Sequence, residues 1–363
     1  MALAPIRLLV VDDSAYNRRN IADVFASSAD VEVVGKAADG EEALRLATLL
    51  KPDVITLDLE MPRMDGFTFL RILMVKQPTP VIVVSSYSQK ENVFKALELG
   101  ALDFVAKPDR QIAPDAVDLR EQILAKVLLV RSLRATFTPP VSRRFAPSGS
   151  WSPDGRPVDS ESAPKVSTQY VAPKHVVAIA SSTGGPSALL EIFGKMPATS
   201  TATLLVAQHM PDKFTRTFAE RLDKRGAVRT TEGQDGDLVA RLTGFVCPGR
   251  QCMEVVSHGN ELRLRVGPAS PNDRYVPSAD RLLKSAAAAA AGVRAHCTAV
   301  ILTGMGDDGV EGAKAIRDAG GTVIAESQET AVVYGMPGAA VRAGIVHKTL
   351  GLPQIAEYLA GLT

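Results

Sequence analysis

Short apolar runs alternate with polar segments of helical length along the first third of the chain. Each run is rich in β-branched or other apolar residues, so each predicts a buried strand. The runs lie at residues 6–11, 31–36, 53–57, 80–84 and 102–105. The segment that opens at Asp39 carries Glu41 and Glu42 in its first turn, as helix N-termini do. Five strands alternating with five helices predict a parallel, doubly wound sheet.

This alternation stops after a helix predicted over about residues 115–134. Residues 136–173 are rich in Pro, Ser and Gly and show little apolar periodicity. Such a composition predicts a flexible linker between two domains. The expected division is therefore a first domain at 1–135, the linker at 136–173 and a second domain at 174–363.

A second series of strands and helices begins after residue 174. Its predicted strands lie at 176–180, 203–207, 298–302 and 322–325, and its predicted helices at 187–193, 213–222, 278–291 and 309–319. Residues 237–266 are less periodic and are expected to hold antiparallel strands. The chain thus predicts an α/β protein of two doubly wound parallel-sheet domains, the second of them Rossmann-like.

Composition and charge narrow the classes of function. The 363 residues are 46% hydrophobic and 22% charged, with a net charge of +1, so nothing draws the chain electrostatically to nucleic acid or to an anionic membrane. No stretch has the apolar length of a membrane span or the pattern of a signal peptide. Cys247, Cys252 and Cys297 match no zinc spacing, so reduced, mostly buried thiols in a cytoplasmic protein are expected.

Acidic residues follow the strands of the first domain. Asp12 and Asp13 come directly after the first predicted strand, and Asp58 directly after the third. Strands of an open parallel sheet present their carboxyl ends at one edge, and three carboxylates there would repel one another unless a hard cation such as Mg²⁺ bound them. A carboxylate beside Mg²⁺ can attack phosphorus and form an acyl phosphate.

Two further positions fit such a phosphate site. Ser85 ends the fourth predicted strand and Lys107 follows the fifth, so both could hold phosphate oxygens. Taken singly, each of these residues has a plainer explanation, because Asp13 or Ser14 could cap a helix and Asp58 could lie in a turn. The order of the matching positions along the chain favours the phosphate site.

The same segments resemble the receiver domains of response regulators. The resemblance covers about residues 5–130 and rests on VVDDS at 10–14, LDLEMP at 57–62, MDG at 64–66, VSS at 84–86 and FVAKP at 104–108. It implies Asp58 as the phosphoacceptor, which with Asp12 and Asp13 binds Mg²⁺. It also implies a switch made by Ser85, Phe104 and Lys107, and a sensor histidine kinase as phosphodonor.

A serine-containing turn follows the first strand of the second domain. Residues 181–186 read SSTGGP, and a helix is predicted to begin at Pro186. A serine there would face free N–H groups at a helix N-terminus, which suit an oxyanion. The turn lacks the usual G-x-S-x-G pattern, and a helix cap or a phosphate-binding turn explains this segment equally well.

A histidine and a carboxylate are predicted at the same edge of that sheet. His209 ends the strand 203–207, whereas His175 precedes its strand and His258 lies in a turn. Asp307 and Asp308 follow the strand 298–302 in a glycine-rich turn, where one of them could instead cap a helix or, less well, bind a metal. A nucleophile, a base and an orienting acid are the parts of a hydrolytic triad.

The second domain resembles the protein-glutamate methylesterases of bacterial chemotaxis, the CheB family. The resemblance runs from about residue 174 to the C-terminus and rests on STGG at 182–185, QHMP at 208–211, CPG at 247–249, PSAD at 277–280 and LTGMGDDG at 302–309. It implies a triad of Ser182, His209 and Asp308, with Thr183 and the Met305 backbone at the oxyanion site. Ser181 and Asp307 depart from the commoner family residues.

Together the two resemblances imply a phosphorylation-activated enzyme. It would hydrolyse glutamate methyl esters and deamidate glutamines on the cytoplasmic part of chemoreceptors, with Mg²⁺ for phosphorylation and no cofactor at the esterase site. Neither nucleic acid nor membrane insertion is expected. A non-enzymatic signalling module and a DNA-binding regulator are the rival interpretations; the candidate triad opposes the first, and the lack of a basic recognition helix opposes the second.

Overall fold

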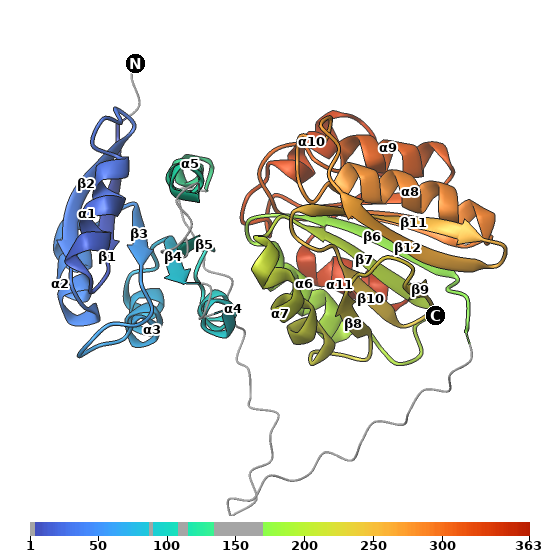
Figure 1. The fold of residues 1–363 in the computed structure, drawn as a ribbon, viewed down its shortest axis with the longest axis horizontal. Helices are drawn as coiled ribbons and strands as arrows, with labels where there is room; N and C mark the ends of the chain where they lie inside the picture. Colours follow the sequence, from blue (N-terminus) through green and yellow to red (C-terminus); the bar gives the residue numbers. More distant parts are fainter. Residues whose placement is uncertain (1–3, 87–89, 108–114, 134–169) are drawn as a thin grey trace, which may run out of the picture.

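The structure, a computed structural model, describes residues 4–86, 90–107, 115–133 and 170–363 (Figure 1). Most of the predicted linker, residues 136–169, lies outside these ranges. Its last residues belong to the second domain: the Tyr170 hydroxyl donates to the carbonyl of Asn260 at 3.3 Å and accepts from the Leu262 N–H at 3.2 Å. The Arg241 N–H also donates to the Val171 carbonyl, at 3.0 Å.

The first domain is a parallel five-stranded sheet, as the sequence predicts, and its strands lie in the order β2-β1-β3-β4-β5. Its strands are β1 (Ile6–Val11), β2 (Val31–Ala37), β3 (Val54–Leu57), β4 (Val81–Ser86) and β5 (Asp103–Lys107). Its helices are α1 (Ala15–Val24), α2 (Gly40–Leu50), α3 (Gly66–Lys76), α4 (Lys90–Glu98) and α5 (Asp115–Leu128), followed by a 3₁₀ turn at Leu129–Ser132.

Alternation along the strands places helices on both faces of this sheet. In β1, Leu8 and Val10 pack in one core with residues of α1 and α5, while Leu9 and Val11 pack in another with residues of α2, α3 and α4. Local polar residues fix where helices begin, because Asp39 and Asp65 each accept a backbone N–H in the first turn of their helix.

The second domain is built on a parallel seven-stranded sheet in the order β15-β14-β13-β6-β7-β10-β8. The strands are β6 (His175–Ser181), β7 (Ala202–Gln208), β8 (Arg229–Glu232), β10 (Thr243–Val246), β13 (His296–Ile301), β14 (Thr322–Glu326) and β15 (Lys348–Leu350). The chain runs outward from β6 through β7 and later returns to β13 on the other side of β6. That reversal creates a crevice at the carboxyl ends of β6 and β13.

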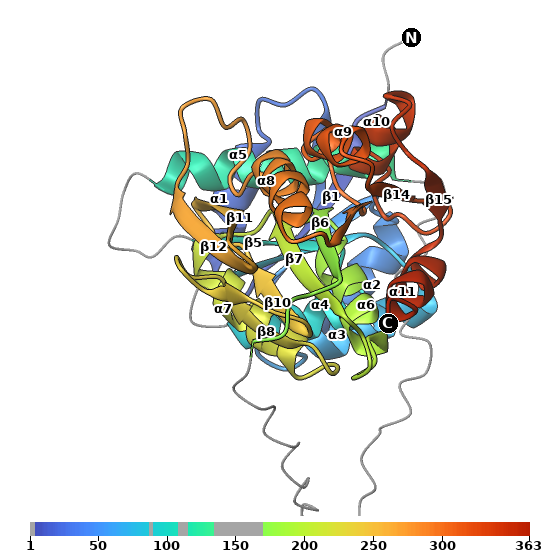
Figure 2. The same ribbon diagram turned by 90° about the vertical axis from the view of Figure 1, so that its right-hand side faces the viewer.

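Two layers of helices cover this larger sheet. Figure 1 shows α8 (Ala279–Gly292), α9 (Val310–Asp318) and α10 (Met336–Arg342) over one face, and α6 (Gly185–Lys195), α7 (Asp212–Asp223) and α11 (Leu352–Ala360) over the other. Figure 2, turned by 90°, shows this domain in front of the first. None of the helices in the described ranges is long and apolar enough to span a membrane.

The middle of the second domain contains both antiparallel and parallel strands, whereas only antiparallel strands were predicted there. Antiparallel strands do form there, as β9 (Leu238–Val239), β11 (Gln251–His258) and β12 (Glu261–Pro268) pair in a separate sheet. Within the same stretch, however, β10 joins the main sheet in parallel with β7 and β8. Residues 243–246 read TGFV, too short and too polar a run to indicate a buried parallel strand.

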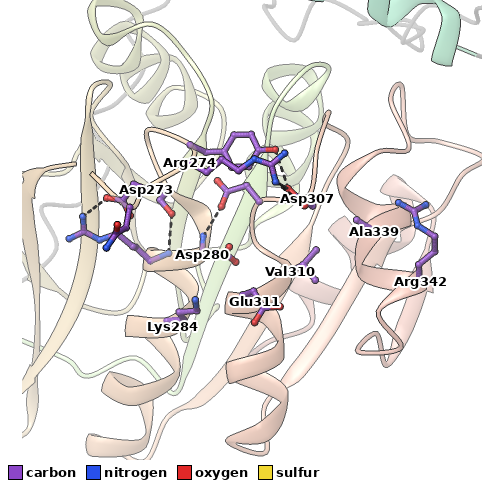
Figure 3. A pocket seen from close by; sticks show the side chains of 14 residues that line it. Asp273, Arg274, Asp280, Lys284, Asp307, Val310, Glu311, Ala339 and Arg342 are labelled. Carbon is purple, nitrogen blue, oxygen red and sulfur yellow. Dashed lines mark hydrogen bonds and ion pairs between the residues drawn. The ribbon is translucent and has the colours of Figure 1, made fainter. Parts of the chain in front are cut away.

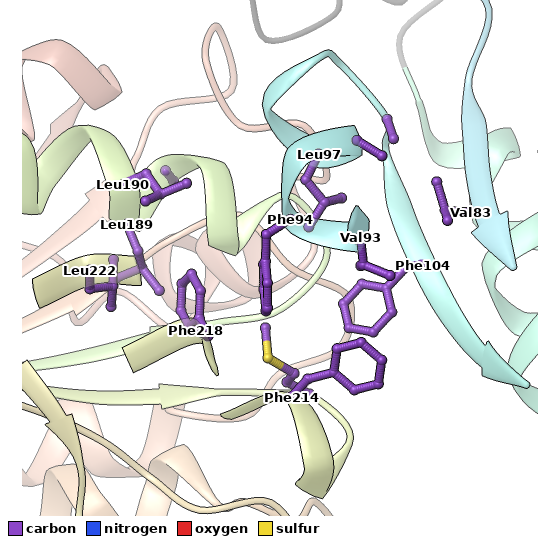
Figure 4. Close-up of a cluster of buried hydrophobic side chains, with 14 of the residues drawn as sticks. Val83, Val93, Phe94, Leu97, Phe104, Leu189, Leu190, Phe214, Phe218 and Leu222 are labelled. Atoms are coloured by element: carbon purple, nitrogen blue, oxygen red, sulfur yellow. The ribbon is translucent and has the colours of Figure 1, made fainter. Parts of the chain in front are cut away.

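The two domains meet through an aromatic cluster (Figure 4). Phe94 of α4 stacks on Phe218 of α7, with ring centroids 5.4 Å apart, and Phe104 of β5 lies 4.6 Å from Phe214 of α7. Beside them, the Arg221 Nε donates to Glu98 Oε1 at 3.0 Å. Apolar residues of both domains therefore form one continuous core across the interface.

Candidate functional site

The acidic residues of the first domain converge at the carboxyl end of its sheet. One carboxylate oxygen from each of Asp12, Asp13 and Asp58 lies within 4.8 Å of the others, and Asp13 is the exposed member. Lys107 Nζ lies 2.9 Å from Asp12 Oδ2 and 2.7 Å from Asp58 Oδ2. Burial raises the pKa of the Asp58 carboxyl, although the Lys107 ammonium opposes that rise.

This arrangement suits a divalent cation. Three carboxylates held together, one of them open to solvent, offer the hard oxygen ligands that Mg²⁺ takes while it keeps several waters. Ser85 is fully buried in β4 nearby on the same sheet. Phe104 is also buried, but its ring faces the second domain rather than solvent.

The two neighbouring serines at the end of β6 have different surroundings. Ser181 is fully buried, and its hydroxyl donates to Gln208 Oε1 at 2.7 Å. Ser182 is partly exposed in the turn before α6, and its N–H donates to the Thr303 carbonyl at 3.0 Å. Gly184, at φ +82°, allows this turn to fold. Only the Ser182 side chain is thus open to a substrate.

A glycine loop lies directly against Ser182. A Cβ atom at Gly304 would fall 2.7 Å from the Cβ of Ser182, so only glycine permits this approach. Within the described residues, neither the Thr183 N–H nor the Met305 N–H donates a hydrogen bond. Backbone N–H groups without an acceptor could donate hydrogen bonds to an oxyanion.

His209 and Asp308 meet at the same crevice. His209 Nε2 lies 2.8 Å from Asp308 Oδ2, and the backbone N–H of His209 donates to the Ser181 carbonyl. The buried Asp308 carboxylate also accepts the N–H groups of Ala279 and Asp280, at 2.8 and 3.0 Å. Asp308 therefore holds the imidazole and at the same time caps α8. No direct hydrogen bond joins the Ser182 hydroxyl to His209 in the part of the chain that is described.

Asp307 and Asp308 are adjacent but contact different residues. Asp307 pairs with Arg274, whose Nη1 lies 3.1 Å from Asp307 Oδ1 (Figure 3). Both carboxylates line a cavity of about 540 Å³ next to the crevice. Of the two aspartates, Asp308 is therefore the one that contacts His209.

Two residues at the crevice were not singled out from the sequence. Tyr275 stacks on His209, and Asp103 of β5 accepts a hydrogen bond of 2.5 Å from the Thr183 hydroxyl. Asp103 also pairs with Lys126 of α5. Tyr275 lies in an irregular loop and Asp103 in the other domain, so neither periodicity nor strand order indicates its position. The first domain consequently reaches the turn that carries Ser182.

The cysteines have no part in this site. All three are free and buried. Burial raises the pKa of Cys297 to about 12 and that of Cys247 still further, so these thiols stay protonated and unreactive.

Comparison with known proteins gives matches along nearly the whole chain. Residues 177–359 match the family described as CheB methylesterase, and residues 8–116 match the response regulator receiver domain. A protein-glutamate methylesterase/protein-glutamine glutaminase of Myxococcus xanthus is 45% identical over 98% of this chain and 97% of its own. The protein-glutamate methylesterase/protein-glutamine glutaminase of Pyrococcus abyssi is 38% identical over 97% of this chain and 92% of its own length. Among solved structures, the Thermotoga maritima CheB methylesterase catalytic domain is 36% identical, covers 53% of this chain and 100% of its own, and gives a TM-score of 0.49.

Proposed function

Since this chain belongs to the CheB family of protein-glutamate methylesterases/protein-glutamine glutaminases and carries a receiver domain, we propose that it demethylates chemoreceptors with a triad of Ser182, His209 and Asp308. The observation that carries the triad is the convergence of an accessible Ser182 and an Asp308-bound His209 at the ends of β6, β7 and β13. The burial of Ser181 with its hydrogen bond to Gln208, and the pairing of Asp307 with Arg274, support Ser182 and Asp308 for these roles.

In the first half of the reaction the Ser182 Oγ attacks the ester carbonyl carbon of a methylated glutamate side chain. Asp308 binds His209 at Nε2, which leaves Nδ1 to accept the serine proton. The carbonyl oxygen becomes an oxyanion, stabilised by the N–H groups of Thr183 and Met305. The C–O bond to the methoxy group then breaks, His209 returns the proton to it, and methanol leaves.

In the second half a water molecule attacks the acyl-enzyme with His209 again accepting its proton. Breakage of the acyl–Oγ bond frees the glutamate carboxylate and restores Ser182. A glutamine side chain passes through the same acyl-enzyme with ammonia as the leaving group, so deamidation needs no further residue. Every step uses side chains and backbone groups of this chain.

The receiver domain is proposed to hold the enzyme at low activity until Asp58 is phosphorylated by a sensor histidine kinase in the cytoplasm. Asp12, Asp13 and Asp58 would bind the Mg²⁺ that this phosphorylation needs. Two contacts support a receiver domain that covers the proposed catalytic residues: Phe104 packs against Phe214, and Asp103 accepts a hydrogen bond from the Thr183 hydroxyl. Ser85 and Lys107 would bind the new phosphate, and repacking of Phe104 would weaken these contacts.

Methanol release from a methylated chemoreceptor fragment tests the proposal. With Mg²⁺ and a small phosphodonor such as acetyl phosphate, the rate should rise above that of the unphosphorylated protein. Asp58→Ala should retain the basal rate and lose the stimulation. An Asp58→Ala protein that is still stimulated would refute the phosphorylation site, and an active Ser182→Ala protein would refute the triad.

A further inference from the structure

The ring of Tyr275 lies face to face with the imidazole of His209. The two ring centroids are 5.3 Å apart and the planes differ by 10°. Tyr275 lies in the loop between β12 and α8, which the triad itself does not use. Asp308 holds one edge of the imidazole, so the two contacts together fix both the edge and the plane of the ring.

The phenol end of Tyr275 is anchored on the loop that also carries Asp308. Its hydroxyl donates to Asp307 Oδ1 at 3.1 Å. Arg274 Nη1 binds both Asp307 oxygens, at 3.1 and 3.2 Å, and the Arg274 guanidinium carbon lies 5.1 Å from the centre of the Tyr275 ring. Gly306 makes room for the phenol, because a Cβ at this position would fall 2.5 Å from the hydroxyl.

The environment keeps Tyr275 a neutral phenol. Burial, together with the hydrogen bond and charge of Asp307, raises the pKa of Tyr275 above its ordinary value. The phenol therefore cannot act as a base near neutral pH, and its hydroxyl proton is committed to Asp307. What Tyr275 offers His209 is the face of its ring, whose negative quadrupole attracts a cation.

We propose that Tyr275 is a positioning residue for His209, anchored by Asp307, which fixes the plane of the imidazole and stabilises the imidazolium that forms when Ser182 is deprotonated. This inference rests on the proposed triad. It also gives Asp307 a task in the same loop: Asp308 orients His209 directly and Asp307 does so through Tyr275.

The charged groups around this stack are few. Asp308 contacts the imidazole directly. Asp307 and Arg274 form an ion pair beside the Tyr275 ring. Asp280 donates its backbone N–H to the Asp308 carboxylate. Tyr275 supplies the aromatic face next to the imidazole. Its removal is therefore expected to move the acid limb of the pH–rate profile to lower pH, because the protonated ring loses a stabilising neighbour.

Four variants of the full-length, phosphodonor-activated protein separate the possibilities on methylated receptor. Tyr275→Leu removes the stack, Tyr275→Phe retains it without the anchor, and Asp307→Ala removes the anchor alone. Tyr358→Leu is the matched control, because Tyr358 of α11 contacts Lys348 instead. Turnover of Tyr275→Leu should fall by about 10- to 100-fold, the effect of a misplaced catalytic group, with KM within about threefold.

The other variants complete the pattern. Tyr275→Phe should stay within about threefold of the parent, because the ring face remains. Asp307→Ala should show a smaller loss, and adding it to Tyr275→Leu should cause no further loss, since it acts through the same ring. A Tyr275→Leu protein as active as Tyr358→Leu, or one altered only in KM, would overturn the positioning role. Ser182→Ala is assayed in parallel: if it is active, the triad has failed, whatever Tyr275 does.

Discussion

At the scale of single residues, Ser181 and Ser182 differ in burial, because Ser181 is fully buried in β6 and Ser182 is partly exposed in the turn that follows. Ser182→Ala should lower turnover by on the order of 10³-fold or more, because only substrate binding and the oxyanion donors would remain. Ser181→Ala should stay active but lose about 1–3 kcal/mol of stability, since it leaves the buried Gln208 Oε1 without its donor. Methanol release and urea unfolding of both proteins measure the two effects. Reversed activities would assign the nucleophile to Ser181.

The adjacent aspartates allow an equally direct comparison. Asp308→Asn should lower turnover by on the order of 10⁴-fold, because an amide cannot hold the imidazole as a carboxylate does. Asp307→Asn should have an effect of about threefold or less, since its amide oxygen can still accept the Tyr275 hydroxyl. The assay is turnover on methylated receptor at saturating phosphodonor. Equal losses in the two proteins would contradict the division of tasks between these residues.

At the scale of elements, the loop that follows β13 depends on one buried carboxyl. Glu326, the last residue of β14, accepts the Thr303 N–H at 2.8 Å and the Thr330 hydroxyl at 2.9 Å. Burial raises the pKa of Glu326 from 4.5 to about 7. The folded state thus holds the proton more tightly than the unfolded state, so the stability that this group contributes is present below about pH 4.5 and is lost as the pH rises through about 7.

Glu326→Gln should remove that loss because glutamine carries no charge. Relative to the parent, the variant should gain up to about 3 kcal/mol of unfolding free energy between pH 5 and pH 8. Urea unfolding at both pH values measures the difference, with Glu357→Gln, an exposed carboxyl of α11, as the control. An equal pH dependence in the parent and in Glu326→Gln would show that Glu326 ionises without penalty in the folded protein.

The sequence predicted elements well where a long apolar run or a strong helix cap marked them. The strands that end at the candidate sites, such as β1, β6 and β13, are of this kind, and their order brings Asp12, Ser182 and Asp308 to sheet edges. Short elements such as β10 and α10 were not predicted, because four to seven residues with glycine or proline carry too little periodicity. Their places are decided by packing against the rest of the sheet.

Contacts between segments that are distant along the chain could not be predicted from the sequence either. Tyr275 contacts His209, and Asp103 contacts Thr183, only because loops and domains meet in the folded chain, and no local sequence pattern predicts such contacts. Residues 302–309 place two adjacent aspartates in one turn, and the sequence favoured Asp308 only through the family resemblance, whereas the structure shows that Asp308 contacts His209 and Asp307 contacts Arg274.

At the scale of the whole molecule, we expect phosphorylation of Asp58 to act on the interface between the two domains. The ring of Phe94 stacks on that of Phe218, and its centroid lies 6.3 Å from those of both Phe104 and Phe214, so Phe94 links β5 of the first domain to α7 of the second. Next to Phe104, Asp103 accepts a hydrogen bond from the Thr183 hydroxyl, in the turn that carries Ser182. We therefore expect a movement of β5 that repacks Phe104 to alter this contact with the turn.

Phe94→Ala should favour the undocked state without phosphate. Loss of a buried phenylalanine costs about 3–5 kcal/mol of packing, which is enough to shift a two-state equilibrium by two orders of magnitude or more. The unphosphorylated variant should thus demethylate receptor at a rate near that of the phosphorylated parent, and a phosphodonor should add little.

Val75→Ala, an exposed change on α3, is the control within the same domain. Beryllofluoride binding at Asp58 checks that the receiver remains folded. If folded Phe94→Ala keeps the low basal rate and full stimulation, occlusion by this interface is excluded, and the receiver must instead activate the catalytic domain directly.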